Sequence, residues 1–151
     1  MKEEASLVAV DFEAIDQFAN GGLERGEIHG FPVAGDPAAQ GFEVAAALLL
    51  SDGTVVPGVN VENASYGLTC CAERTALFSA VTQGRRDIQA IAVVSNRIAP
   101  IYPCGACRQV LSELCLPQTP VLMRGDNGGI VARTVGDLLP EGFKLLEPMS
   151  R

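Results

Sequence analysis

The chain has 151 residues, of which 48% are hydrophobic and 19% are charged. These proportions predict a single globular domain over residues 1–151 and exclude an intrinsically disordered chain. Eleven basic residues against eighteen acidic ones give a net charge of −7, which disfavours a nucleic-acid polymer as a partner because such binding needs a basic surface.

The segment 1–41 is predicted to form a helix followed by an irregular loop. Apolar side chains at positions 7, 12, 15 and 18 have loose helical spacing, and residues 21–41 are rich in glycine and contain two prolines. The stretch 1–20 is acidic, unlike a signal or transit peptide. The longest purely apolar run, Val44 to Leu50, is too short to span a bilayer. We therefore expect a cytoplasmic protein without a membrane partner.

From residue 42 onward the pattern alternates strands with helices. Strands are predicted at 42–50, 54–61, 88–95, 121–123 and 130–133, and helices at 71–81, 105–114 and 134–139. The first two strands flank the turn Ser51-Asp52-Gly53 and should form a hairpin. The resulting fold class is α/β: a three-layer α/β/α sandwich with a mixed five-stranded sheet.

Two cysteine motifs carry the most information about function. Cys71-Ala72-Glu73 precedes Cys104-Gly105-Ala106-Cys107, and each motif begins a predicted helix, where the dipole favours thiolates. Tetrahedral zinc takes four ligands, and a catalytic site leaves one of them to water. The motifs predict one Zn²⁺ per subunit held by three cysteines, with Glu73 free to move the protons of that water.

Each part of this pattern also has a simpler explanation. Cys104-x-x-Cys107 alone fits a redox pair or half of a structural zinc site. Glu73 alone fits a first-turn glutamate that complements the helix dipole. The matched spacing of the two motifs favours catalysis. Arg74, which in isolation is a solvated side chain, is then placed to donate to the cysteine sulfurs and offset their negative charge.

The other cysteines and the single histidine have no such placement. An odd number of cysteines without a secretion signal argues against a disulfide framework. We expect Cys70 and Cys115 to be small buried apolar residues. His29 lies in the glycine-rich segment and is expected to be an exposed loop residue.

From Phe42 to about Phe143 the chain resembles the small, homotetrameric, all-cysteine cytidine deaminases. The motifs that carry the resemblance are Phe42-Glu43-Val44, the run 58–66, Cys71-Ala72-Glu73-Arg74-Thr75-Ala76, Pro103-Cys104-Gly105-Ala106-Cys107-Arg108-Gln109 and Leu138-Leu139-Pro140. The resemblance implies zinc-dependent hydrolysis of cytidine or deoxycytidine to uridine or deoxyuridine with release of ammonia, as in pyrimidine salvage. Zinc deaminases in general combine the same elements: a zinc-activated water, a cysteine-bound metal and a glutamate acid/base.

The resemblance also implies roles for individual residues. Cys71, Cys104 and Cys107 would hold zinc, and Glu73 would pass a proton from the water to N3 of the pyrimidine. The substrate-binding residues would be Phe42, Asn60, Glu62, Ala72 and Phe143. Asn60 and Glu62, two apart on a predicted strand, would share a face and grip the ribose 3′-hydroxyl. Phe42 and Phe143 would pack on the base, Phe143 in a neighbouring subunit of a homotetramer with shared active sites.

The segment before Phe42 departs from the family pattern. Ala39-Gln40 stand near the position of the usual Tyr-Ser pair, and Ala45 replaces a common glycine. A same-fold deaminase of another aminopyrimidine nucleoside, or of a blasticidin-like antibiotic, therefore stays open. A non-catalytic zinc-stabilised binding module is the alternative from another class. A polynucleotide deaminase is disfavoured by the acidic charge.

Overall fold

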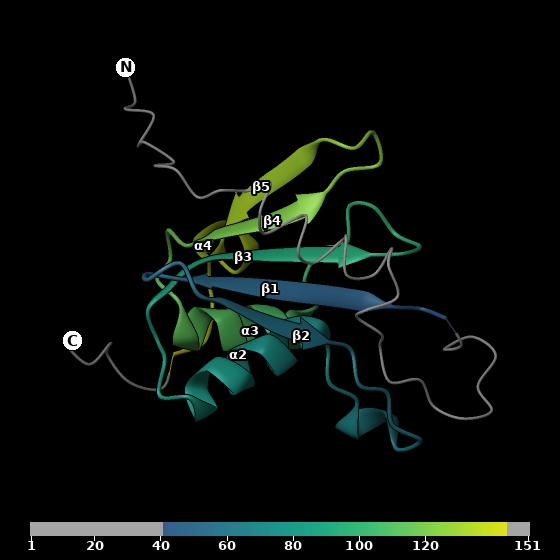
Figure 1. Ribbon diagram of the computed structural model, residues 1–151, viewed down its shortest axis with the longest axis horizontal. Helices are drawn as coiled ribbons and strands as arrows, with labels where there is room; N and C mark the ends of the chain where they lie inside the picture. Colours follow the sequence, from purple (N-terminus) through teal and green to yellow (C-terminus); the bar gives the residue numbers. More distant parts are fainter. Residues whose placement is uncertain (1–40, 145–151) are drawn as a thin grey trace.

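A computed structural model describes residues 41–144 and contains a five-stranded sheet of order β2-β1-β3-β4-β5 (Figure 1). The strands are β1 (Val44–Leu50), β2 (Val55–Val59), β3 (Ile88–Ser95), β4 (Pro120–Arg124) and β5 (Ile130–Thr134). The helices are α2 (Ala72–Thr82), α3 (Gly105–Leu114), α4 (Val135–Leu138) and the short 3₁₀ helix η1 (Tyr66–Leu68).

The sheet is mixed, as predicted. The pairs β1–β2, β1–β3 and β4–β5 are antiparallel, and β3–β4 is parallel. The parallel pair is connected through α3, because parallel neighbours need a crossover of this kind. The α/β class and the mixed five-stranded sheet are thus confirmed.

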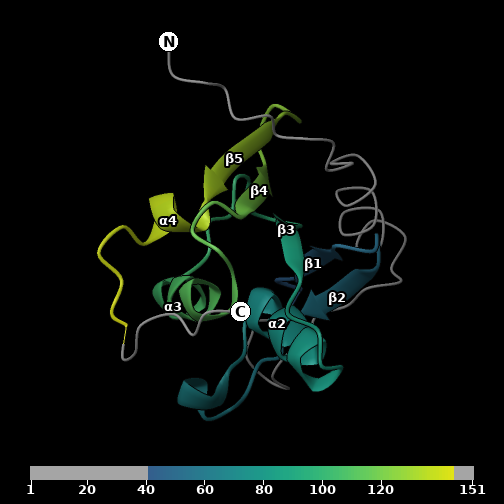
Figure 2. The same ribbon diagram turned by 90° about the vertical axis from the view of Figure 1, so that its left-hand side faces the viewer.

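Helices α2 and α3 lie side by side on one face of the sheet (Figure 2). The main hydrophobic core lies between them and the inward residues of β1, β3 and β4, with side chains of α4 at its margin. The opposite face is lined mainly by alanines of β1 and β3. Within residues 41–144 that face is covered by none of the helices, and the helix predicted within the stretch 1–20 lies outside the described part of the chain.

Most predicted elements agree with the structure to within one or two residues. The main difference is β2, which ends at Val59 rather than at Val61. Asn60 and Glu62 therefore lie in the connection after the strand, where Val61 makes an isolated bridge with Cys70. The helix η1 in the same connection was not predicted.

Strand β2 and helix α2 meet at Gly58, where only a glycine fits. A Cβ atom at this position would lie 2.3 Å from the carbonyl oxygen of Ala72 and 2.4 Å from the backbone nitrogen of Ala76. Both are backbone atoms of the first two turns of α2, and neither can move without moving the helix. The absent side chain of Gly58 therefore sets the position of the helix that follows Cys71.

The substitution Gly58→Ala is expected to destabilise the protein by about 1–3 kcal/mol, since overpacking at rigid contacts costs this much. Thermal unfolding of the zinc-loaded protein measures the effect as a lower Tm. Gly67→Ala is the matched control, because a Cβ there meets no atom within 4 Å, and its Tm should stay close to that of the wild type. Equal melting of the two variants would contradict the close approach of β2 and α2.

Candidate metal centre

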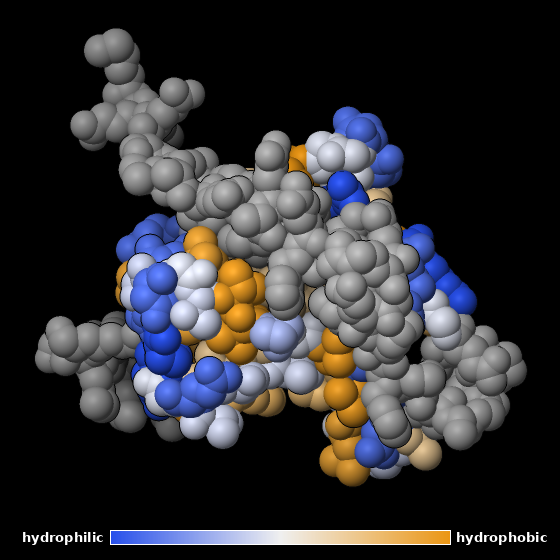
Figure 3. Space-filling view, in the orientation of Figure 1, coloured by the Kyte–Doolittle hydropathy of each residue, from blue (hydrophilic) through white to orange (hydrophobic). Residues whose placement is uncertain are grey.

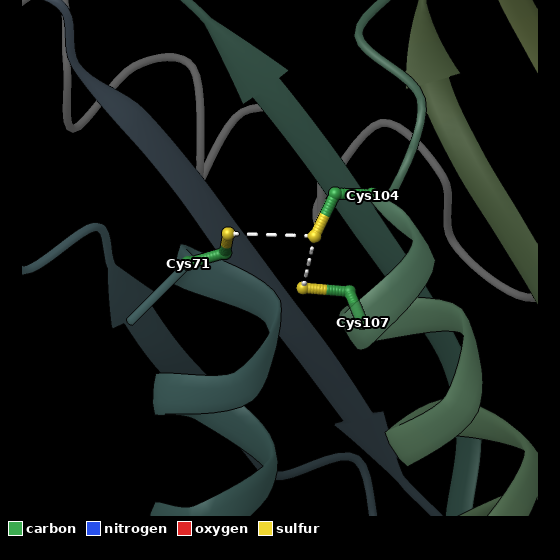
Figure 4. A group of neighbouring side chains, drawn as sticks. All are labelled: Cys71, Cys104 and Cys107. Atoms are coloured by element: carbon green, nitrogen blue, oxygen red, sulfur yellow. Dashed lines mark hydrogen bonds between the residues drawn. The ribbon is translucent and has the colours of Figure 1, made fainter. Parts of the chain in front are cut away.

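Three cysteine sulfurs gather where the N-termini of α2 and α3 come together (Figure 4). Cys71 directly precedes α2, Cys104 directly precedes α3, and Cys107 lies in the first turn of α3. The Sγ atoms of Cys71 and Cys104 are 3.7 Å apart, and those of Cys104 and Cys107 are 3.5 Å apart. All three sulfurs lie within 4.8 Å of one another.

This arrangement fits a tetrahedral zinc ion. A Zn–S bond of about 2.3 Å with tetrahedral angles places two sulfurs about 3.8 Å apart, close to the spacings of Cys71, Cys104 and Cys107. Thiolates are also the soft ligands that select zinc. Among residues 41–144 the group contains three candidate ligands, and a tetrahedral zinc ion takes four.

The surroundings of the cluster stabilise a thiolate. A hydrogen bond from Cys107 and a second from Arg74 lower the pKa of Cys71, against the opposing effect of burial. The same hydrogen bond with Cys71, together with burial, raises the pKa of Cys107. One thiolate is thus favoured even before a cation is bound, and a divalent cation favours the rest.

Arg74 supplies positive charge beside the cluster. Its Nη2 atom lies 3.8 Å from Cys71 Sγ and donates to the carbonyl oxygen of Thr69 at 3.0 Å. Its Nε is a buried donor that lacks a hydrogen-bond partner in the described structure. The guanidinium is therefore fixed by the Thr69 carbonyl and directed at the first of the three sulfurs.

Glu73 lies in the first turn of α2 and is only 4% exposed. Burial raises the pKa of its carboxyl group, and the negative charge of Cys71 raises it further. A carboxyl group of this kind exchanges protons closer to neutral pH than an exposed one does. Ala72 beside it is fully buried, with its carbonyl oxygen against Gly58 of β2.

Asn60 and Glu62 are brought together by the connection after β2 rather than by the strand itself. Asn60 is 4% exposed, and its Nδ2 donates to Glu62 Oε1 at 3.2 Å and to the Phe42 carbonyl oxygen at 3.0 Å. Its Oδ1 accepts from the Val44 amide at 2.9 Å. The phenyl ring of Phe42 is half-buried and packs against the main core.

Phe143 is held differently from the other candidate residues. Its side chain is 70% exposed, although its carbonyl oxygen accepts a hydrogen bond from Gln109 Nε2 on α3 at 2.9 Å. The backbone is thus anchored to the helix that carries Cys107 while the ring projects away from the core of its own chain.

The remaining cysteines take no part in the cluster. Cys115 is half-buried and packs against the main core, whereas half-buried Cys70 accepts a hydrogen bond from Thr75 Oγ1 at 3.7 Å. Both are more exposed than predicted, because each lies at one end of a helix. His29 lies outside the described residues.

Two residues important for the site's geometry were not predicted: Gly58 and Asn96. Gly58 lies in a run that carries the family resemblance, but nothing in that run indicates the contact with α2. Asn96 forms hydrogen bonds with Glu43 and Gly41, which lie 53 and 55 residues earlier in the chain.

In the described part of the chain, none of the helices combines the length and apolar character needed to cross a membrane.

The sequence of the chain is similar to a known family model and to individual known proteins. A family model for the cytidine and deoxycytidylate deaminase zinc-binding region matches residues 33–123. A cytidine deaminase from Halalkalibacterium halodurans is 58% identical over 102 residues, covering 68% of this chain and 77% of the relative. One from Mycobacterium tuberculosis is 41% identical over 109 residues, covering 69% and 74%.

Solved structures of cytidine deaminases resemble the described fold. The enzyme from Burkholderia pseudomallei aligns with a TM-score of 0.75 at 45% identity, over 87% of this chain and 98% of that chain. The enzyme from Mycobacterium tuberculosis aligns with a TM-score of 0.70 at 36% identity, over 91% and 100%.

Proposed function

The chain belongs to the cytidine and deoxycytidylate deaminase family, and we propose that it converts cytidine or deoxycytidine to uridine or deoxyuridine with release of ammonia. It is a zinc-dependent hydrolase whose substrate is a small nucleoside. The observation that carries this proposal is the cluster of Cys71, Cys104 and Cys107 at zinc spacing, directly beside buried Glu73. A purely structural zinc site would not need a buried carboxylate there.

Zinc held by Cys71, Cys104 and Cys107 would supply Lewis-acid activation of a water molecule. Glu73 handles the protons of the reaction. It accepts one from the attacking water, delivers it to N3 of the pyrimidine, and later assists the departure of ammonia from C4. Its raised pKa suits it to both halves of this exchange, because a group that must take and give a proton works best near the operating pH.

Arg74 offsets the charge of the cysteine cluster. Three thiolates on a divalent ion leave a net charge of about −1, which opposes ionisation of a bound water. The positive charge of the guanidinium, whose Nη2 lies 3.8 Å from Cys71 Sγ, offsets part of that negative charge. Arg74 thus acts through Cys71 and not on the substrate.

Asn60 and Glu62 bind the ribose in this proposal. The hydrogen bond between Asn60 Nδ2 and Glu62 Oε1 orients the carboxylate, which is the stronger acceptor for a sugar hydroxyl. Phe42 and the backbone of Ala72 line the base pocket. This set favours a nucleoside over a free base.

We further propose a homotetramer in which Phe143 enters the site of a neighbouring subunit. Tyr66, Leu68 and Phe143 are 72%, 71% and 70% exposed, and apolar atoms reach the surface at the lower edge of Figure 3, near η1. Large exposed apolar side chains of this kind are typical of protein interfaces. Light scattering coupled to gel filtration measures the assembly directly.

A cytoplasmic location is part of the same proposal. All five cysteines are free of disulfide bonds, which is typical of proteins kept in a reducing compartment.

The function is tested by incubating zinc-loaded protein with cytidine and deoxycytidine while following the cytosine absorbance and the ammonia released. Loss of absorbance with one ammonia per nucleoside is the expected result. Ammonia from a modified nucleoside or an aminopyrimidine antibiotic, with none from cytidine, would move the assignment to another substrate. A zinc-loaded protein that turns over none of these compounds would contradict an enzymatic function.

A further inference from the structure

Two asparagines hold the segment that carries Phe42 into β1, one from each side. Asn60 follows β2 and Asn96 follows β3, and these strands are the two neighbours of β1 in the sheet. We call this pair the asparagine bracket. Because β1 begins only at Val44, residues 41–43 have no strand on either side to pair with, and the bracket takes that place.

The hydrogen bonds of the bracket alternate along the segment. Asn96 Nδ2 donates to the Gly41 carbonyl oxygen at 2.8 Å, and Asn96 Oδ1 accepts from the Glu43 amide at 3.1 Å. On the other side, Asn60 contacts the Phe42 carbonyl and the Val44 amide at 3.0 and 2.9 Å. Successive backbone groups of a strand point to opposite sides, so the two side-chain amides continue the sheet ladder beyond the end of β1.

The backbones of the two asparagines extend the same pattern. The Asn96 amide donates to the Glu43 carbonyl and the Asn60 amide donates to the Val44 carbonyl, each at 3.2 Å. The backbone around Phe42 is therefore fixed by six hydrogen bonds that come from only these two residues. The side chain of Phe42 is half-buried and packs against the main core.

We propose that Asn96 is a positioning residue for the substrate pocket, acting through Phe42. The proposal rests on the function proposed above, in which Phe42 packs on the base. Asn96 itself is exposed, so the core does not require it. The side-chain amide satisfies both sides of the contact, because the Gly41 carbonyl takes a donor and the Glu43 amide takes an acceptor.

The expected effect falls on substrate binding rather than on chemistry. The cysteines and Glu73 are carried by α2 and α3, whereas the side-chain amide of Asn96 bonds the segment before β1. Loss of the bracket from one side loosens Phe42 and raises KM for cytidine, with kcat close to the wild-type value. The two hydrogen bonds to backbone groups that are lost, at ordinary strength, predict a rise of about 5- to 150-fold.

The first test compares Asn96→Ala and Asn96→Asp with Asn127→Ala, all zinc-loaded. Asn127 is the matched control, because its side chain also accepts a backbone amide hydrogen bond, from Gly129 at 3.0 Å, in the distant β4–β5 turn. Asn96→Ala should raise KM with an unchanged zinc content, and Asn127→Ala should leave KM unchanged. Asn96→Asp keeps the acceptor for the Glu43 amide, loses the donor for Gly41 and places a second carboxylate beside that of Glu43, so its KM should rise as well.

The route through Phe42 is tested by a double-mutant cycle. In a Phe42→Leu background, Asn96→Ala should no longer change KM, because the ring that it positions is absent. An equal rise in KM with and without the ring overturns the proposal.

Amide hydrogen exchange supplies a readout that needs no turnover. The Glu43 amide should exchange faster in Asn96→Ala than in the wild type, and at the wild-type rate in Asn127→Ala. Unchanged exchange at Glu43 overturns the proposal even if KM rises. A wild-type protein that deaminates no nucleoside overturns the proposed function instead, and faster exchange at Glu43 then still supports the positioning of Phe42 by Asn96.

Discussion

Replacing Glu73 by glutamine is expected to leave zinc bound and to lower kcat for cytidine by at least about 10²–10⁴-fold, the usual contribution of a general acid/base. Glutamine keeps the size of the side chain and fills the same buried position, but it can neither accept a proton from water nor return one to the base. Glu73→Ala should have the same effect on turnover with zinc retained. Steady-state kinetics together with the zinc content of each protein measure the two expectations.

Glu113→Gln is the control for this substitution. Glu113 is an exposed glutamate on α3 that accepts a hydrogen bond from Gln109 at 3.0 Å and is not a member of the cysteine cluster. Its removal should change kcat by less than about twofold, as for surface residues in general. Substantial turnover by Glu73→Gln would exclude the acid/base role of Glu73. Loss of zinc from that variant would indicate that Glu73 helps to hold the metal instead.

Replacing Cys107 by serine is expected to abolish both zinc binding and turnover. Cys107 is fully buried and carries the sulfur that α3 contributes from its first turn. A serine hydroxyl is not ionised at neutral pH and is a poor zinc ligand, so two thiolates remain where three are needed. The zinc content measured by elemental analysis should fall from one zinc per chain in the wild type to near zero. The kcat should fall by at least as much as in Glu73→Gln.

Cys115→Ser is the matched control, because it removes a half-buried thiol at the other end of the same helix. It should keep its zinc and its turnover. A chelator should remove zinc and activity together from the wild type, and added Zn²⁺ should restore both. Stoichiometric zinc in Cys107→Ser would contradict the three-cysteine centre.

The metal centre was predictable because its ligands are local. A Cys-x-x-Cys spacing places two sulfurs on one helical turn, and glycines and apolar periodicity locate the helix and its flanking strands. The third sulfur, from Cys71, was linked to this pair by its Cys-x-Glu motif at the start of the preceding predicted helix, and the family resemblance supported the link. The structure then supplied what sequence spacing does not contain, namely the 3.7 Å that separates Cys71 from Cys104.

The supports of the site were not predictable, because they depend on neighbours distant in the chain. The end of β2 at Val59 was missed since Asn60 and Val61 continue the apolar alternation of a strand. Gly58 has an ordinary backbone conformation, and only its contact with α2 explains it. Asn96 reads as a loop residue after a strand, and its partners lie 53 and 55 residues earlier.

The cysteine cluster also has a consequence for how the polypeptide survives in a cell. Its sulfurs come from helices whose N-termini are 33 residues apart, and closing a loop of that length costs an unfolded chain about 3 kcal/mol of entropy. In the folded chain the packing of α2 against α3 has already closed it. Zinc thus acts as a reversible cross-link that binds the native state more tightly than the unfolded chain, so a cell starved of the metal would lose the protein itself to degradation as well as its activity.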